Sequence, residues 1–213
     1  MSKKQALTEF HRGSILAAAE RLFAEKGIEG TTMDDIAREA EYSKATLYVY
    51  FQSKEEIINA ILLSSMILLQ KKIREAIARS TGWYEGYDAV CSAIIRFYGE
   101  NPTAYDAISG DLEVSSSSGE SKSVKDILKV SDETDGILAD FLDRGIREGA
   151  VRTPLPTAEV VQLFWAALSG MVRMAEHKAA HMERTIGVNR ETFLHHGAQL
   201  LLAAITTGKP ANG

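Results

Sequence analysis

The sequence lacks the features that define several protein classes. Only one of its 213 residues, Cys91, is a cysteine, so no disulfide can form within the chain. That usage is typical of a reducing compartment. No apolar run approaches the length of about 20 residues that crosses a bilayer, since the longest candidate, Ala60 to Leu69, is interrupted by Ser64 and Ser65. The polar N-terminal residues show no apolar signal-peptide core. We therefore expect a soluble, cytoplasmic protein that does not enter a membrane.

Catalytic and metal-binding motifs are also lacking. We find no Gly-rich phosphate loop, nucleophile elbow, HExxH or CxxC motif, and no paired acid and base. His177 and His181 lie four residues apart, a spacing that can hold a metal on one helix face. No carboxylate completes that site, so we interpret the pair as a solvated surface. Cys91 lies on an apolar stripe and is interpreted as a core residue. The sequence predicts a protein that is not an enzyme and has no cofactor and no metal.

The charge of the chain is divided unevenly. The net charge is −5, which argues against a general polyanion binder. Residues 1–54 hold eight Lys or Arg and eight Asp or Glu, whereas the remaining residues hold sixteen basic and twenty-one acidic ones. Any nucleic-acid binding by the first segment must therefore depend on where its lysines are placed, with the acidic remainder facing away from the phosphates.

Almost every segment repeats its apolar residues at the period of a helix, and no segment alternates like a strand. The pattern predicts an all-α protein. The expected helices are, approximately, 9–26, 32–40, 43–50, 54–79, 84–99, 103–112, 123–148, 158–185 and 190–207. The serine-rich stretch 115–123 is expected to be a loop. In the helix over 123–148 we expect six apolar residues to face inward: Ile127, Leu128, Leu138, Phe141, Leu142 and Ile146.

The first three helices have the lengths and spacing of a helix-turn-helix. Thr32 with Asp35 forms a capping box for the second helix, and Ser43 caps the third. The third helix carries hydroxyl groups, one lysine and two tyrosines, which suit phosphates and base edges better than a core. Its Leu47, together with Phe51 just after it, is expected to point back at the first two helices.

These residues resemble a known family. The segment TTMDDIAREAEYSKATLYVYFQSKEEII, residues 31–58, is similar to the signature of the TetR/AcrR regulators, whose usual form is close to TT…IA…AGVSKGTLYHYFxSKEEL. The resemblance implies a DNA-binding domain over residues 1–53. It also implies nine DNA-contacting residues: Thr32, Tyr42, Ser43, Lys44, Ala45, Thr46, Tyr48, Tyr50 and Lys54. Tyr48 and Lys54 are expected to hold phosphates, and Lys44, Ala45 and Thr46 to face the bases.

Four positions depart from the family's usual form. Glu41 replaces the glycine of the turn, where a positive φ costs a non-glycine residue about 1 kcal/mol. Tyr42 replaces valine, Ala45 replaces glycine, and Val49 replaces histidine. Because Ala45 leaves less room for the backbone to approach DNA, the operator sequence cannot be carried over from the family.

The resemblance implies that a long helix joins this domain to a helical dimerisation and ligand-binding domain over residues 54–213. The helix over 158–185 is apolar on nearly every side, so it must be buried on two faces. The resemblance implies that it pairs with the helix over 190–207 and with the same two helices of a second subunit, as a four-helix interface. Such a homodimer would present two recognition helices to a palindromic double-stranded DNA operator.

The middle of the body is rich in aromatic and methionine side chains, and the resemblance implies that a small-molecule effector binds there. We expect a small apolar or aromatic effector of unknown identity, contacted by Tyr87, Tyr98, Tyr105, Phe141, Phe164, Trp165, Met171 and Met174. Its binding is expected to tilt the helix over 54–79 and release a repressor from its operator. A DNA-binding regulator that responds to a protein partner or a metal instead remains the alternative.

Overall fold

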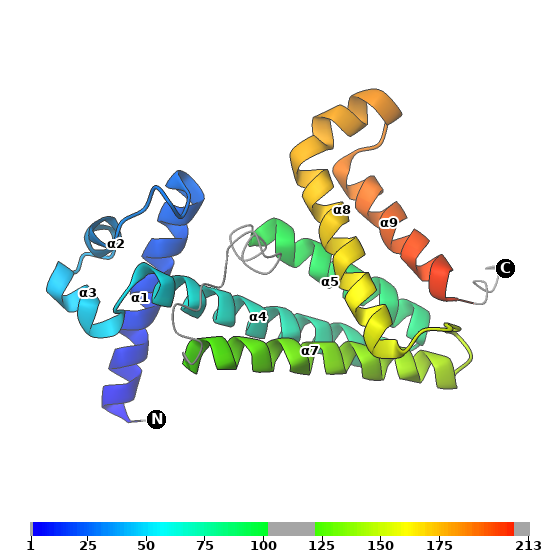
Figure 1. The fold of residues 1–213 in the computed structure, drawn as a ribbon, viewed down its shortest axis with the longest axis horizontal. Coiled ribbons are helices and arrows are strands. Elements are labelled where there is room, and N and C mark those ends of the chain that lie inside the picture. Colours follow the sequence, from blue (N-terminus) through cyan, green and yellow to red (C-terminus); the bar gives the residue numbers. More distant parts are fainter. Residues whose placement is uncertain (1, 102–121, 207–213) are drawn as a thin grey trace. The chain divides into compact units, whose positions relative to one another are not determined.

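The structure is a computed structural model that describes residues 2–101 and 122–206. It contains the following helices (Figure 1): α1 (Lys3–Lys26), α2 (Met33–Glu39), α3 (Lys44–Tyr50), α4 (Lys54–Arg79), α5 (Trp83–Glu100), α7 (Lys122–Arg147), α8 (Thr157–Ile186) and α9 (Arg190–Ile205). Within these residues the only strand-like pairing is one bridge, between Val151 and Thr206. The all-α prediction is confirmed. The helix predicted over 103–112 and most of the loop over 115–123 lie outside the described residues.

The chain divides into two compact units, each of which contains parts of α4 and α7. The first unit comprises residues 1–67 and 101–129, and the second comprises residues 68–100 and 130–213. The boundary predicted between residues 53 and 54 falls at the first residue of α4, which itself continues from the first unit into the second.

The ends of the first helices are fixed by side-chain caps. The hydroxyl of Ser2 accepts from the backbone N–H of Gln5, whose side chain accepts from the N–H of Ser2 at 2.8 Å. This capping box starts α1 at Lys3, six residues before the predicted start. The predicted capping box of Thr32 with Asp35 is present at α2. Ser43 caps α3 by accepting from the N–H of Thr46, also as predicted.

The core of the first unit holds α3 in place. Leu47 and Phe51 are fully buried and pack with residues of α1, α2 and the first turns of α4, among them Ile15, Ile36 and Ile57. Each such side chain contributes about 1.5–3 kcal/mol by leaving water. The prediction that Leu47 and Phe51 face the other helices is confirmed.

The core of the second unit is built around Trp83 at the start of α5. Its ring stacks on Phe141 of α7 at 5.3 Å between centroids, and its indole N–H donates to the carbonyl of Phe141 at 2.9 Å. Two glycines permit this approach. A methyl group added to Gly145 would lie 2.4 Å from the indole nitrogen, and one added to Gly86 would lie 2.9 Å from the Phe141 ring.

The predicted inward face of α7 is confirmed in part. Ile127, Leu138, Phe141 and Leu142 are buried, but Leu128 is 58% exposed and Ile146 is 42% exposed. The prediction for these two residues was wrong. At about 100° per residue, both lie roughly 100° around the helix from Ile127. That angle places them at the edge of the buried stripe.

Helices α8 and α9 pack against each other as a hairpin (Figure 1). Gly187, in the left-handed conformation, ends α8, and Asn189 caps α9. Close approach of the two helices depends on Gly197, since a methyl group there would lie 2.2 Å from the sulfur of Met171. The backbone of α8 departs from helical angles at Lys178, where the helix kinks.

These contacts lead to a prediction about Gly145. Replacing Gly145 with alanine should lower the free energy of unfolding by about 1–3 kcal/mol, because the added methyl group forces Trp83 out of its stack. The matched control is Gly136→Ala on the same helix, where a methyl group would meet nothing within 4 Å. That control should raise stability by up to about 1 kcal/mol through helix propensity. Equal shifts in urea denaturation would contradict the role assigned to the Trp83 contact.

Candidate nucleic-acid interface

The turn between α2 and α3 sets the direction in which α3 leaves the core. Glu41 has φ = 61°, and in the described residues it is the only non-glycine with positive φ. The backbone N–H of Tyr42 then donates to the carbonyl of Ala37 at 2.8 Å, which closes the turn. The strain of about 1 kcal/mol or more at Glu41 is therefore present, as the sequence predicted.

Helix α3 buries one side and exposes the other. The exposed residues of α3 and its cap are Ser43, Lys44, Ala45, Tyr48 and Val49, of which Ala45 and Val49 lie opposite the buried Leu47. Thr46 is half-buried, and its hydroxyl lies 2.7 Å from that of Ser43. Of the predicted DNA contacts on this element, Ser43, Lys44, Ala45 and Tyr48 are thus accessible. Thr32, which caps α2, is also exposed.

Tyr42 and Tyr50, which were predicted to touch DNA, pack against α1. The hydroxyl of Tyr42 lies 2.6 Å from Nδ1 of His11, and the Tyr50 ring lies 5.4 Å from the His11 ring. Arg12 donates to the carbonyl of Tyr50 at 2.6 Å and lies over the ring of Phe51, 4.0 Å from its centroid. These contacts tie the two ends of α3 to α1.

Sequence reasoning missed His11 and Arg12, the α1 residues that hold these tyrosines. An available signal was their position between the apolar stripe of α1 and its exposed face. Two adjacent polar residues there need partners from another element, because buried polar groups are hydrogen-bonded.

Lys44 is paired with an acidic residue of α2. Its ammonium lies 2.7 Å from Oδ1 of Asp34, and this contact raises the pKa of Lys44. Both side chains are more than half exposed, so the pair is screened by water. Asp34 holds the ammonium at the start of α3 in free protein, and a phosphate would have to compete for it.

Lys54 is half-buried at the start of α4 and holds a loop. Its ammonium donates to the carbonyls of Ile28 at 2.8 Å and Thr31 at 3.1 Å, in the connection between α1 and α2. Thr31 is itself buried and donates to the carbonyl of Gly27 at 2.8 Å. An ammonium has three N–H donors. Two of the N–H donors of Lys54 therefore hold the fold, and the third remains for the phosphate contact that the sequence predicted.

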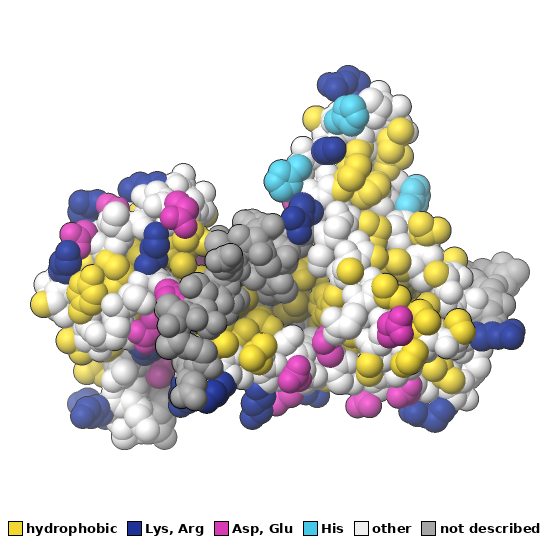
Figure 2. Space-filling model, in the orientation of Figure 1, with side chains coloured by type: hydrophobic (Ala, Val, Ile, Leu, Met, Phe, Trp, Pro, Cys, Tyr) yellow, Lys and Arg dark blue, Asp and Glu magenta, His cyan; other side chains and the backbone are white. Residues whose placement is uncertain are grey.

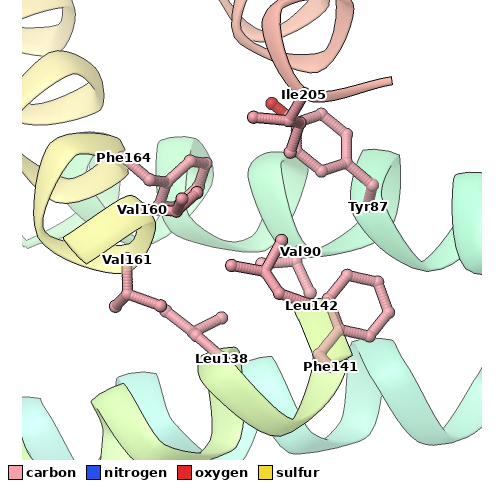
Figure 3. A pocket seen from close by; sticks show the side chains of 9 residues that line it. All are labelled: Tyr87, Val90, Leu138, Phe141, Leu142, Val160, Val161, Phe164 and Ile205. Atoms are coloured by element: carbon pink, nitrogen blue, oxygen red, sulfur yellow. The ribbon is translucent and has the colours of Figure 1, made fainter. Parts of the chain in front are cut away.

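A second site lies wholly within the second unit. Side chains of α5, α7, α8 and α9 line a hollow that is partly open to solvent (Figure 3). It is lined by Tyr87, Val90, Leu138, Phe141, Leu142, Val160, Val161, Phe164 and Ile205. The one polar group among these side chains, the Tyr87 hydroxyl, donates to the carbonyl of Ala198 at 2.9 Å. The hollow therefore suits an uncharged apolar group.

Only three of the eight predicted effector contacts line this hollow: Tyr87, Phe141 and Phe164. Trp165 instead donates to Asp135 at 2.9 Å, and Met171 packs against Gly197. Tyr98 is buried beside Phe97. Met174 is 45% exposed. Tyr105 lies outside the described residues.

The hollow is lined by six aliphatic residues that the sequence analysis did not assign to the site. They come from four helices, and each one matches the apolar period of its own helix. Because a buried stripe and a pocket wall have the same pattern, no sequence signal could have separated the two.

Cys91 and the histidines do not form a reactive centre. Burial raises the pKa of the Cys91 thiol to about 12, and burial also raises the pKa of the Tyr87 hydroxyl. His177 and His181 are exposed on either side of the kink at Lys178. In the described part of the chain, no group of three or more His, Cys, Asp or Glu could hold a metal, and no described helix is long and apolar enough to span a bilayer.

A short helix that is braced by another across a tight turn, with a lysine and hydroxyl groups on its accessible face, defines a helix-turn-helix DNA-binding protein. The first unit has this arrangement. A profile of the family described as "Bacterial regulatory proteins, tetR family" matches residues 15–61. The first unit of this chain therefore resembles the DNA-binding domain of TetR-family transcriptional regulators.

Known proteins agree with this assignment over different lengths. YhgD of Bacillus subtilis, an uncharacterised helix-turn-helix regulator, is 26% identical over 72% of this chain and 80% of its own length. The repressor KstR2 of Rhodococcus jostii is 35% identical, but the match spans 42% of this chain and 49% of KstR2. The structure of FadR from Bacillus subtilis in complex with stearoyl-CoA is 19% identical. The match covers 90% of this chain and 98% of FadR with a TM-score of 0.67, so the two proteins share a fold. The curated relatives are named as regulators, not enzymes.

The site predicts different outcomes for Lys54 and Thr46. Lys54→Met should lower the free energy of unfolding by about 1–3 kcal/mol, because it leaves two backbone carbonyls without their donor. It should also weaken binding to all DNA sequences about equally and flatten the salt dependence by about one ion. Thr46→Ala should instead change the order of preferred sequences. Fluorescence anisotropy over a salt series checks both, and identical effects of the two variants would refute the division of roles.

Proposed function

We propose that this chain is a homodimeric repressor that binds a palindromic operator and leaves it when a small apolar or aromatic effector enters the hollow of the second unit. The observation that carries the proposal is the hollow itself, an apolar space in the body of a TetR-family regulator. Residues 1–53 would contact the DNA, and residues 54–213 would bind the effector and the second subunit.

An exposed apolar stripe on α8 supports the dimer. Val161, Leu168, Val172 and Ala175 are buried on one side of the helix. Leu163, Ala166, Gly170 and Met174 lie about 180° away from them and are all exposed. A helix with apolar residues on two opposite faces needs a partner on each. The rest of the chain supplies one of these partners, and a second copy would supply the other.

Helix α9 extends the same kind of surface. Its Leu200 is 73% exposed, and Ala203 and Ala204 beside it are exposed as well. Figure 2 shows hydrophobic side chains along α8 and α9, with few charged ones among them on that face. Small residues such as Ala204 and Gly170 allow two helices to approach closely. A pair of hairpins packed on this stripe would form the four-helix interface expected from the sequence.

The chemistry of the hollow supports an apolar effector. Eight of its nine lining residues have side chains without a hydrogen-bonding group, and the ninth has its hydroxyl engaged. An ionised group would lose its hydration there without a partner. The similarity to FadR, whose structure holds stearoyl-CoA, supports testing acyl chains among the ligands.

The route from the hollow to the DNA-binding unit runs through α7. Leu138, Phe141 and Leu142 of this helix line the hollow, while its first residues belong to the first unit. There Ile127 packs with Leu62 of α4. No residue of α4 lines the hollow. We infer that effector binding acts first on α7, and that α4 moves as a consequence. Such coupling requires a difference in effector affinity between the two states, typically worth about 1–3 kcal/mol.

A regulator that senses a protein partner or a metal is the second candidate. Two measurements would distinguish it from the effector model. One tightly bound ion per chain in purified protein, or a partner that occupies the stripe of α8 in place of a second copy, would favour it over the effector model.

The stripe predicts the effect of a charge on oligomeric state. The double variant Leu163→Glu with Leu200→Glu should sediment as a monomer, because two carboxylates would have to leave water at the interface. It should bind a palindromic operator, selected from random DNA with the wild type, at least about tenfold more weakly. Leu128→Glu, which changes an equally exposed leucine of α7, is the control and should remain dimeric. A dimeric double variant would overturn the interface.

The hollow predicts a ligand response that depends on Phe164. In a panel of apolar and aromatic compounds and acyl-CoAs, a ligand at 100 times its dissociation constant should stabilise the protein by about 2.7 kcal/mol. The same ligand should lower operator affinity. Phe164→Ala removes a wall of the hollow and should reduce both responses, whereas Phe10→Ala on exposed α1 should leave them intact. If no compound shifts either melting or operator affinity, the effector proposal fails.

A further inference from the structure

The outermost residue of α3 has no role in the contacts described so far. Val49 is 75% exposed, a larger fraction than for any other large hydrophobic side chain in the described part of the chain. None of the described residues of the first unit covers it. Hydrophobic side chains are visible at the surface over α3 in Figure 2, with charged side chains around them. In the free protein, a side chain this exposed contributes little burial free energy to the fold.

The geometry of α3 places Val49 beside Ala45. Leu47 is fully buried, and each of these residues lies two positions from it, or about 200° around the helix in opposite directions. Ala45 and Val49 are therefore neighbours at i and i+4 on the side opposite the core. They form the outer ridge of α3, which we define as these two residues. Lys44 and Tyr48 lie on one flank of the ridge, and Thr46 lies on the other.

The whole ridge fits within one groove of DNA. Helix α3 has seven residues and is about 10 Å long at 1.5 Å per residue. The major groove is about 12 Å wide. Residues at either end of such a short helix can therefore reach base edges when its outer side enters the groove.

The chemistry of the ridge limits what it can recognise. Neither an alanine nor a valine side chain can donate or accept a hydrogen bond, so the ridge cannot distinguish the polar atoms of the base edges. Thymine is the one standard base that presents an apolar group in the major groove, its C5 methyl. Val49 is also stiff about χ1, so little conformational entropy is lost when it packs.

We propose that the outer ridge of α3 reads the C5 methyl groups of thymines, and that Val49 is a specificity-determining residue of this regulator. The inference rests on the proposed binding to a specific operator. The flanking lysine and hydroxyl groups would hold phosphates and polar base atoms, while the ridge would select A·T pairs at one or two positions of each half-site.

The test removes one methyl group at a time from the DNA. An operator is first selected from random DNA with the full chain, and each thymine is then replaced singly by deoxyuridine, which keeps the pairing edge but lacks the methyl group. For the wild type, at least one replacement in each half-site should weaken binding about fourfold, the value expected for one buried methyl group. For Val49→Ala, the same replacement should change the affinity by less than about 1.5-fold.

Ile146→Ala is the matched control. It truncates a β-branched side chain of α7 that is 42% exposed and lies outside every proposed contact, so its response to deoxyuridine should equal that of the wild type. Circular dichroism checks that all variants keep their helical content.

The possible outcomes distinguish a failure of specific operator binding from a failure of the role of the outer ridge. Failure to enrich any sequence would overturn specific operator binding. An enriched operator that tolerates deoxyuridine at every thymine would overturn the reading of methyl groups by the outer ridge but not operator binding. A Val49→Ala variant that keeps the full sensitivity would overturn the role of Val49.

Discussion

The recognition helix has only seven residues, and a helix of that length is not stable by itself in water. Its conformation and direction depend on the burial of Leu47 and Phe51 in the core formed with α1, α2 and α4. Once these two side chains are fixed, the period of the helix decides which residues face outward. Mutations deep in the core can therefore alter DNA recognition without touching a DNA-contacting residue.

Hydrogen bonds near both ends of α3 also fix its position. Arg12 holds the carbonyl at its last residue, and His11 holds the side chain of Tyr42 just before it. Lys54 ties the α1–α2 connection to the start of α4. Charged and aromatic residues that the sequence predicted to contact DNA thus also support the fold. A residue with both roles will show both effects when it is replaced.

The sequence predicted the helices well because each is amphipathic and several have recognisable caps. It placed the start of α1 too late, because it followed the apolar period and overlooked Ser2 and Gln5, whose spacing is that of a capping box. It assigned Leu128 and Ile146 to the core of α7, since both lie at the edge of the stripe, where periodicity does not separate buried from exposed. The predicted effector residues were aromatic residues and methionines, yet the hollow is lined mostly by aliphatic residues from four helices. That arrangement is set by packing between elements distant in sequence.

The hydrogen bond from Tyr87 to the carbonyl of Ala198 joins the wall of the hollow to the backbone of α9. The bond is buried, and losing it without replacement would cost about 1–3 kcal/mol, comparable to the coupling energy of a typical allosteric protein. A ligand that only fills space beside this ring would bind silently. A ligand that turns the ring would have to break this bond or carry the Ala198 backbone with it, so the orientation of one tyrosine ring would distinguish a ligand that acts on α9 from one that only occupies the hollow.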